Sequence, residues 1–189
     1  MIANGLLIGG VPGAYLALST CSFDFVKLKS NIMSFVVGGI LIELLANTGA
    51  IDNEIGTRES IIRSIVYLVS VEFVFYWSHR LQHMNKFLYK HVHRHHHLEM
   101  NPKPIDAYVL SPVEAIIVTL CFMFPNFVGL RMHKVAFDVT LAVHTFFGVC
   151  IHGEKFTIKY LNHHMIHHQR LNCWYSGPIP IWDYVFSTN

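Results

Sequence analysis

Five apolar stretches, each close to the length that spans a lipid bilayer, dominate this sequence of 189 residues. They cover residues 2–20, 32–51, 61–78, 112–130 and 135–151. A helix needs about 20 apolar residues to cross a hydrocarbon core of about 30 Å. Charged residues make up 14% of the chain, whereas about 25% is usual in soluble domains. The sequence therefore predicts an all-α integral membrane bundle of about four to five transmembrane helices.

The chain has the length of a single domain. A sequence of 189 residues is typical of one hydrophobic core, and no internal repeat or low-complexity linker divides it. We expect residues 1–189 to form one membrane domain, with an N-terminal transmembrane hairpin over 1–60 and a histidine-rich core over 61–189. The first apolar stretch lacks the basic start and the clear cleavage site of a signal peptide, so a retained helix is favoured.

The distribution of Lys and Arg predicts which side of the membrane the polar segments face. Cytosolic loops of membrane proteins carry an excess of these residues. When the stretches cross in alternation, ten of the fourteen basic residues fall on one side: Lys27, Lys29, Arg80, Lys86, Lys90, Arg94, Lys103, Lys155, Lys159 and Arg170. The histidine clusters fall on the same side. We therefore expect a cytosolic, histidine-rich helical cap on the bundle.

Eleven of the fourteen histidines lie within residues 79–97 and 163–168. These windows contain one H-x-x-x-H pair and two H-x-x-H-H triplets, and a further histidine ends the fifth apolar stretch. The residues are the pair His79 and His83, the triplets His93, His96, His97 and His164, His167, His168, and the single His152. Positions i, i+3 and i+4 share one helix face, so the three imidazoles of a triplet can point at one cavity.

Metal binding explains why so many imidazoles gather in one place. Clustered imidazoles repel one another when protonated, and a metal ion removes this repulsion by binding their neutral form. One zinc ion takes four ligands, so nine histidines suit two metal ions with four or five ligands each. Imidazole binds iron, zinc and copper alike. The pattern therefore predicts that residues 61–189 form a di-metal catalytic core, without choosing the metal.

Several other classes of site and partner are disfavoured. The H-E-x-x-H motif of metalloproteases is absent, as is the Glu-x-x-His pair of ferritin-like di-iron bundles. A formal charge of +2 and the lack of a basic stripe argue against nucleic acid as a partner. The four cysteines, Cys21, Cys121, Cys150 and Cys173, form no C-x-x-C pair, so we expect buried thiols and no disulfide framework.

The histidines belong to a longer series of motifs over residues 72–188. The series comprises Glu72, Tyr76-Trp77, His79-Arg80, His83, Leu88-Tyr89-Lys90, His93, His96-His97, Pro112, Glu114, Ile151-His152-Gly153, His164, His167-His168, Trp182-Asp183 and Phe186. It resembles the fatty acid hydroxylase superfamily of membrane histidine-motif di-iron oxidases. Within that superfamily, the segments around His133, His152 and His163 look most like the sterol C-5 desaturase, or lathosterol oxidase, branch.

The resemblance implies an oxidoreductase of lipid metabolism, including sterol biosynthesis. It implies two iron ions, which zinc can replace in the purified protein. It also implies dioxygen and an external electron donor such as cytochrome b5 with its reductase. The substrate is expected to be a membrane lipid, a sterol or a fatty acyl lipid, which is hydroxylated or desaturated at a C–H bond. The resemblance implies an endoplasmic reticulum location with the site facing the cytosol, and makes the nine histidines the iron ligands.

Three further residues are candidates to support the metal site. Glu72, Tyr76, His79 and His83 share one face of a helix, so Glu72 is a candidate to fix the ring orientation of a ligand, with a buried structural role as the alternative. Tyr76 is a candidate in the same way, and with Phe73, Phe75 and Trp77 it is expected to wall a substrate pocket. His144, within the fifth stretch, is a candidate extra ligand or ligand partner.

Two alternatives to an oxidase remain open at this point. A zinc-dependent membrane hydrolase needs a carboxylate base beside the metal, and Glu99 and Glu154 are the acids nearest to the motifs. A metal transporter or metal-storage protein is the second alternative. Transporters place their ligands near the bilayer midplane, whereas these histidines lie at or beyond the ends of the apolar stretches.

Overall fold

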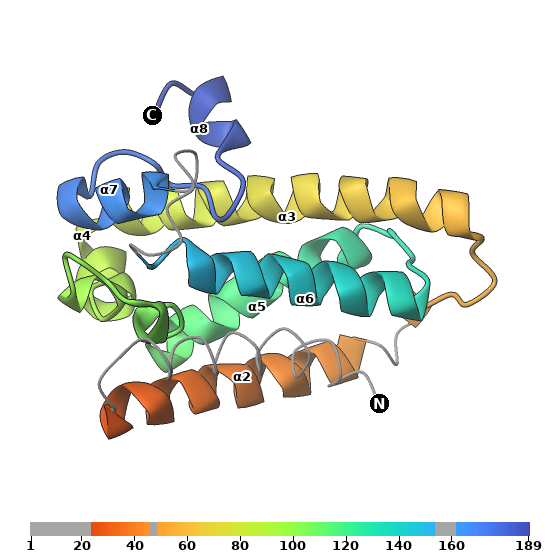
Figure 1. The fold of residues 1–189 in the computed structure, drawn as a ribbon, viewed down its shortest axis with the longest axis horizontal. Coiled ribbons are helices and arrows are strands. Elements are labelled where there is room, and N and C mark those ends of the chain that lie inside the picture. The colour runs from red at the N-terminus through yellow and green to blue at the C-terminus, as the bar shows by residue number, and fades with distance from the viewer. Residues whose placement is uncertain (1–23, 46–48, 154–161) are drawn as a thin grey trace.

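The computed structural model describes residues 24–45, 49–153 and 162–189, and within these ranges it contains helices and no strands (Figure 1). The long helices are α2 (Phe25–Leu45), α3 (Thr57–Met84), α5 (Pro112–Phe127) and α6 (Lys134–Cys150). The short helices are α4 (Lys86–Leu88), η2 (Tyr89–His93), η3 (His96–Leu98), η4 (Pro104–Asp106), α7 (His163–Arg170) and α8 (Ile181–Val185). The predicted all-α class is confirmed for the described residues.

The long helices form a bundle whose short elements gather at one end. α2 and α3 lie on opposite sides, and α5 and α6 lie between them (Figure 1). α5 packs against both α2 and α3, and α6 packs against α3. The C-terminal end of α3 meets α4, η2 and α7, while the loop between α2 and α3 lies at the other end of the bundle (Figure 1). All the histidine motifs therefore lie at one end.

The outer faces of the bundle are apolar, although the bundle also buries an apolar core that includes Val71 and Leu141. Ile65 on α3 is 58% exposed and Val139 on α6 is 55% exposed. Between the same two helices, Ser64 Oγ accepts a hydrogen bond from Thr140 Oγ1 at 3.0 Å. A soluble bundle normally presents polar side chains on its outer faces. The outward apolar faces are therefore suited to lipid.

Two of the described helices are long and apolar enough to cross a membrane, α2 over Phe25–Leu44 and α3 over Thr57–Met84. With 28 residues, α3 is about 42 Å long and extends beyond a hydrocarbon core of about 30 Å. α5 and α6 have 16 and 17 residues, which is short of the usual span of about 20. The first predicted span, 2–20, lies outside the described residues.

The second apolar stretch becomes a helix that starts earlier than expected. α2 begins at Phe25 and not near residue 32, because the side chain of Asp24 accepts hydrogen bonds from the amides of Val26 and Lys27 at 3.0 and 3.1 Å and so caps the helix. Lys27 therefore belongs to the helix and not to the preceding loop. Its ammonium lies 2.7 Å from Asp106, which joins the start of α2 to the histidine-rich end.

The two ends of the bundle are expected to lie on opposite sides of the membrane. Lys90 at the histidine end and Glu54 in the loop between α2 and α3 are both exposed, and α3 separates them. In sealed vesicles, Lys90→Cys and Glu54→Cys variants should be labelled by a membrane-impermeant maleimide from opposite sides. The unsubstituted chain gives the background from its own cysteines. Labelling of both variants from the same side would contradict this topology.

Candidate metal centre

Sharp turns after α3 place the second histidine window beside the first. α3 carries His79 and His83 in its last two turns. Asn85 Oδ1 then accepts hydrogen bonds from the amides of Phe87 and Leu88 at 2.9 and 3.1 Å, which starts a new turn directly after the helix. η2 is a single π-helical turn ending at His93, and η3 begins three residues later. The chain thus folds back onto the end of α3.

The structure brings all nine predicted histidines together, in two adjoining groups. In each group the possible ligand atoms lie within 4.8 Å of one another. We call the first the five-imidazole group, consisting of His79, His83, His93, His97 and His167, and the second the four-imidazole group, consisting of His96, His152, His164 and His168. The rings of His97 and His168 have centroids 4.4 Å apart, so the two groups touch.

Each H-x-x-H-H triplet divides between the groups instead of serving one cavity. The i and i+4 members stay together, as His93 with His97 and as His164 with His168, and the i+3 member joins the other group. On a helical turn, positions i+3 and i+4 differ by about 100° in direction. A turn that faces the boundary between two groups therefore directs one ring to one side and two rings to the other. The sequence expectation of three rings in one cavity was wrong in this respect.

Most of the rings are oriented by a hydrogen bond from the outward nitrogen, Nδ1. For five of the nine, this Nδ1 lies within hydrogen-bond distance of a carbonyl or carboxylate oxygen. The contacts are His79 with Tyr175 O at 2.7 Å, His167 with Cys173 O at 2.6 Å, His152 with Gly148 O at 2.7 Å, His168 with Glu99 O at 3.1 Å and His93 with Glu114 Oε1 at 2.5 Å. Such bonds place the proton on Nδ1 and leave Nε2 as the lone-pair atom.

The inward Nε2 atoms lie too close to one another for neutral rings without a cation. His93 Nε2 lies 2.9–3.0 Å from the Nε2 atoms of three other rings, those of His79, His83 and His97, and a single proton could pair it with only one of them. Two nitrogens bound to one metal at about 2.1 Å, with an angle of 90–110°, lie about 3.0–3.4 Å apart. The Nε2 separations of 2.9–3.3 Å within both groups match this spacing. The residues therefore fit a pair of metal ions.

Burial keeps these imidazoles in the neutral form that binds metal. Desolvation lowers the pKa of His152 to about 4 and that of His168 to about 2, and for His168 the neighbouring ring of His152 adds to the effect. Burial, followed by the charges of neighbouring rings, also lowers the pKa of His96 and His164 well below the usual range. A metal ion therefore meets little competition from protons near neutral pH.

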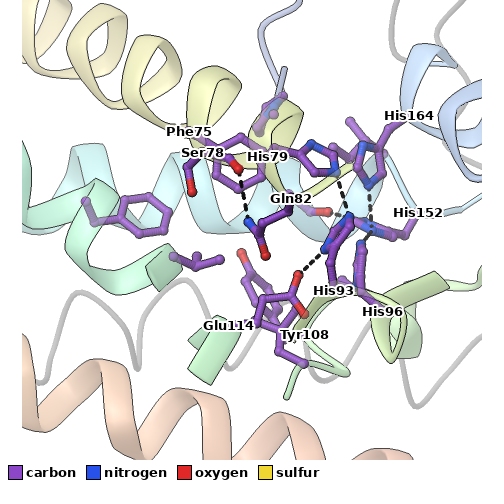
Figure 2. A pocket seen from close by; sticks show the side chains of 18 of the residues that line it. Phe75, Ser78, His79, Gln82, His93, His96, Tyr108, Glu114, His152 and His164 are labelled. Atoms are coloured by element: carbon purple, nitrogen blue, oxygen red, sulfur yellow. Dashed lines mark hydrogen bonds and ion pairs between the residues drawn. The ribbon is translucent and has the colours of Figure 1, made fainter. Parts of the chain in front are cut away.

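A cavity of about 60 Å³ connects the imidazoles with the interior of the bundle (Figure 2). His79, His93, His96, His152 and His164 line one side of it. Apolar side chains also line the cavity, among them Phe75, Leu110, Val118, Phe122 and Ile151. Gln82 reaches into the space between Phe75 and Glu114 (Figure 2). The cavity thus places apolar side chains directly beside the candidate metal ligands.

The three supporting candidates lie near the centre, but within the described residues none is hydrogen bonded to any of the nine imidazoles. Glu72 is fully buried and binds His144 Nε2 at 2.7 Å and the amide of Gly177 at 3.0 Å. The hydroxyl of Tyr76 accepts a hydrogen bond from Arg80. His144 lines the cavity but belongs to neither group. The expected role of Glu72 as a direct partner of a ligand is therefore not what the geometry shows.

Only one of the four aromatic residues expected to wall the pocket does so. Phe75 lines the cavity, whereas Tyr76 packs against Phe186 with ring centroids 5.2 Å apart. Phe73 and Trp77 are 37% and 42% exposed. Successive residues on a helix differ by about 100°, so these four side chains cannot share a face. The prediction for Phe73, Tyr76 and Trp77 was wrong.

Two residues of the site carried only a weak sequence signal. Glu114 is a buried acid in an apolar stretch, which marks a functional candidate, and it contacts His93 directly. Asp183 is fully buried at the C-terminal end. The carbonyl acceptors of Cys173, Tyr175 and Gly148 belong to the backbone, so no residue type identifies them. Cys121 and Cys150 are free and buried, as expected.

These features define the class of protein: a helical bundle with outward apolar faces and, at one end, two groups of histidines with the geometry of metal ligands. Residues 64–188 match the fatty acid hydroxylase family, and the chain belongs to this family. The match includes all nine histidines of the two groups. The family resemblance inferred from the motifs is therefore confirmed.

The relatives of the chain carry the names of several lipid-modifying enzymes. The chain is 29% identical to a Delta(7)-sterol-C5(6)-desaturase of Nicotiana tabacum, over 72% of this chain and 52% of the relative. It is 28% identical to the lathosterol oxidase of Rattus norvegicus, over 65% and 43%, and 27% identical to sphinganine C4-monooxygenase 2 of Arabidopsis thaliana, over 93% and 81%. The chain spans about half the length of the two sterol enzymes. No solved structure matches it.

The metal-free protein is expected to lose stability as the pH falls below about 6.5. In the unfolded chain each imidazole takes up a proton near pH 6.5, whereas the folded pKa of His152 is about 4 and that of His168 about 2. The unfolded state then binds more protons, so this contribution to stability is present above pH 6.5 and declines on acidification. Thermal unfolding of chelator-treated protein in detergent, measured from pH 7.5 to 4.5, should show a falling Tm. A constant or rising Tm would contradict the buried, neutral cluster.

Proposed function

We propose that this protein is a non-haem di-iron oxidase that uses dioxygen to hydroxylate or desaturate a C–H bond of a membrane lipid. The observation that carries the proposal is the convergence of nine Nε2 atoms in a group of five and a group of four. The family, whose named relatives include sterol desaturases and a sphinganine monooxygenase, supports the same chemistry. We propose a sterol or a fatty acyl lipid as the substrate.

The residues of the chain supply binding, orientation and shielding. The outward hydrogen bonds fix five of the nine rings, and the apolar lining of the cavity keeps water from the substrate C–H bond. Two iron ions, when bound, supply the redox chemistry by which dioxygen oxidises an unactivated C–H bond. Hydroxylation consumes one dioxygen, two electrons and two protons and yields one water; desaturation consumes the same and yields two waters.

The two electrons of each turnover require a donor, for which we propose cytochrome b5 with its reductase. The short elements that carry the second and third histidine clusters, with the turn before them, also carry exposed basic residues: Lys86, Lys90, Arg94 and Arg170. This surface suits a donor with acidic groups around its redox centre. We further propose that α5 and α6 cross or deeply enter the bilayer beside α2 and α3. The imidazole groups then face the cytosol from the endoplasmic reticulum.

The two alternatives fit the geometry less well. For a zinc hydrolase, Glu99 was one of the two nearest acids by sequence, but its carboxylate is bound to Lys27 at 2.9 Å and does not act as a partner of the imidazoles. The other, Glu154, lies outside the described residues. For a transporter, the ligands should lie near the middle of the long helices, whereas they gather at one end of the bundle (Figure 1).

Lipid profiling tests the proposed activity. The protein would be expressed in cells that lack individual sterol and lipid oxidases, and the lipids would be analysed by mass spectrometry. We expect a new hydroxylated or desaturated lipid with the unsubstituted chain and none with His96→Ala, because His96 is buried in the four-imidazole group. The matched control is His95→Ala, which changes an exposed neighbour and should retain the product. The same product from His96→Ala would overturn the site assignment.

A further inference from the structure

A single peptide group connects a buried carboxylate with a ligand of the five-imidazole group. The carbonyl of Tyr175 accepts the hydrogen bond from His79 Nδ1 at 2.7 Å. The amide of Ser176, which belongs to the same peptide group, donates to Asp183 Oδ2 at 2.9 Å. Asp183 is fully buried, and its other oxygen accepts from the amide of Tyr175 at 2.7 Å. The carboxylate therefore holds the amide of this peptide group and the amide of the peptide group before it.

The remaining contacts of Asp183 fix it against the rest of the C-terminal segment. Thr188 Oγ1 donates to Asp183 Oδ1 at 2.7 Å, and the amide of Thr188 donates to the Asp183 carbonyl at 2.9 Å. The amide of Trp174 donates to the Thr188 carbonyl at 2.8 Å. α8, which carries Asp183, packs on α3 (Figure 1). The position of the carboxylate is thus set independently of the imidazoles.

A second buried carboxylate, Glu72 on α3, holds the same loop. Glu72 Oε2 accepts from the amide of Gly177 at 3.0 Å, while Glu72 Oε1 lies 2.7 Å from His144 Nε2. A Cβ atom on Gly177 would lie 3.1 Å from both carboxylate oxygens of Glu72, so the loop approaches as closely as a glycine allows. Residues 173–177 are therefore clamped between α3 and α8.

The clamped loop serves only one of the two imidazole groups. Its carbonyls at Cys173 and Tyr175 orient His167 and His79, and both rings belong to the five-imidazole group. In the four-imidazole group, His152 and His168 find their acceptors elsewhere, at Gly148 O and Glu99 O. The two groups also differ in how carboxylates act on them: Glu114 contacts His93 of the five-imidazole group directly, whereas Asp106 acts on His152 of the four-imidazole group through its charge.

We propose that Asp183 is a positioning residue for the five-imidazole group, which acts on His79 through the Tyr175–Ser176 peptide. The carboxylate orients the peptide and polarises it, so that the Tyr175 carbonyl becomes a stronger acceptor for His79 Nδ1–H. A more strongly bound Nδ1–H makes Nε2 a better electron donor. The inference rests on the metal site of the proposed function and adds an asymmetry. Backbone carbonyls orient rings in both groups, but in the five-imidazole group Glu114 contacts a ring directly and Asp183 acts on another through a peptide.

Metal titration of an Asp183→Asn variant tests the proposal. An asparagine presents an NH2 group to one of the two amides, so one of the two hydrogen bonds from the amides of Tyr175 and Ser176 is lost. The volume of the side chain stays almost the same. Partners of metal ligands typically contribute 10–100-fold to metal affinity. We expect about this loss at one of the two metals and none at the other. The measurements are bound metal by mass spectrometry and, on protein loaded with iron-57, a Mössbauer spectrum in which only one iron signal changes.

Two further variants separate positioning from a general effect on folding. Thr188→Val removes one hydrogen bond to Asp183 and leaves both amide contacts, so it should bind both metals normally. Gly177→Ala displaces the loop at its other anchor, the contact with Glu72, and should weaken the metal of the five-imidazole group, as Asp183→Asn does. It keeps the proposal testable if Asp183→Asn fails to fold. Equal weakening of both metals, or of neither, in Asp183→Asn and Gly177→Ala would overturn the role of Asp183 and leave the proposed function standing. Failure of the unsubstituted chain to bind two metals would overturn both.

Discussion

The structure depends on one electrostatic constraint, the convergence of unprotonated imidazole nitrogens at contact distance. His93 Nε2 alone has the Nε2 atoms of His79, His83 and His97 at 2.9–3.0 Å, and a single proton could satisfy only one of these contacts. Such an arrangement is repulsive unless a cation lies between the nitrogens. Burial adds to the constraint, because it lowers the pKa of the imidazoles and removes protonation as a solution. The fold at this end of the bundle is therefore one that metal binding stabilises.

The rest of the chain can be understood as support for this arrangement. α3 carries the first pair of rings beyond the apolar zone, and the turns after Asn85 return the second cluster to it. The short helix α7 supplies the third cluster, and the loop between α7 and α8 supplies carbonyl acceptors. The long helices enclose a cavity that is lined by both imidazoles and apolar side chains. A lipid C–H bond entering from the bundle would meet the site with little water present.

Much of this organisation could be predicted from the sequence, because it follows from periodicity and composition. The spacing of His79 and His83 on a continuing helix, and the gathering of all the histidine motifs at one end, depend only on local rules. The start of α2 was predicted too late, since the cap provided by Asp24 was not considered. The division of each triplet between two groups could not be predicted, because it depends on where a turn sits relative to its neighbours. Backbone acceptors such as Tyr175 O could not be predicted either, because every residue type has a carbonyl group.

X-ray absorption at the metal edge of the purified, metal-loaded protein tests the convergence of the imidazoles most directly. Two metals per chain with nitrogen neighbours at about 2.0–2.2 Å, and the outer-shell scattering of imidazole rings, are the expected result. The average number of nitrogen neighbours should lie between four and five, as groups of four and five rings require. A nearest shell that contains sulfur or mostly carboxylate oxygen, or fewer than two metals per chain, would contradict a site built from these nine histidines.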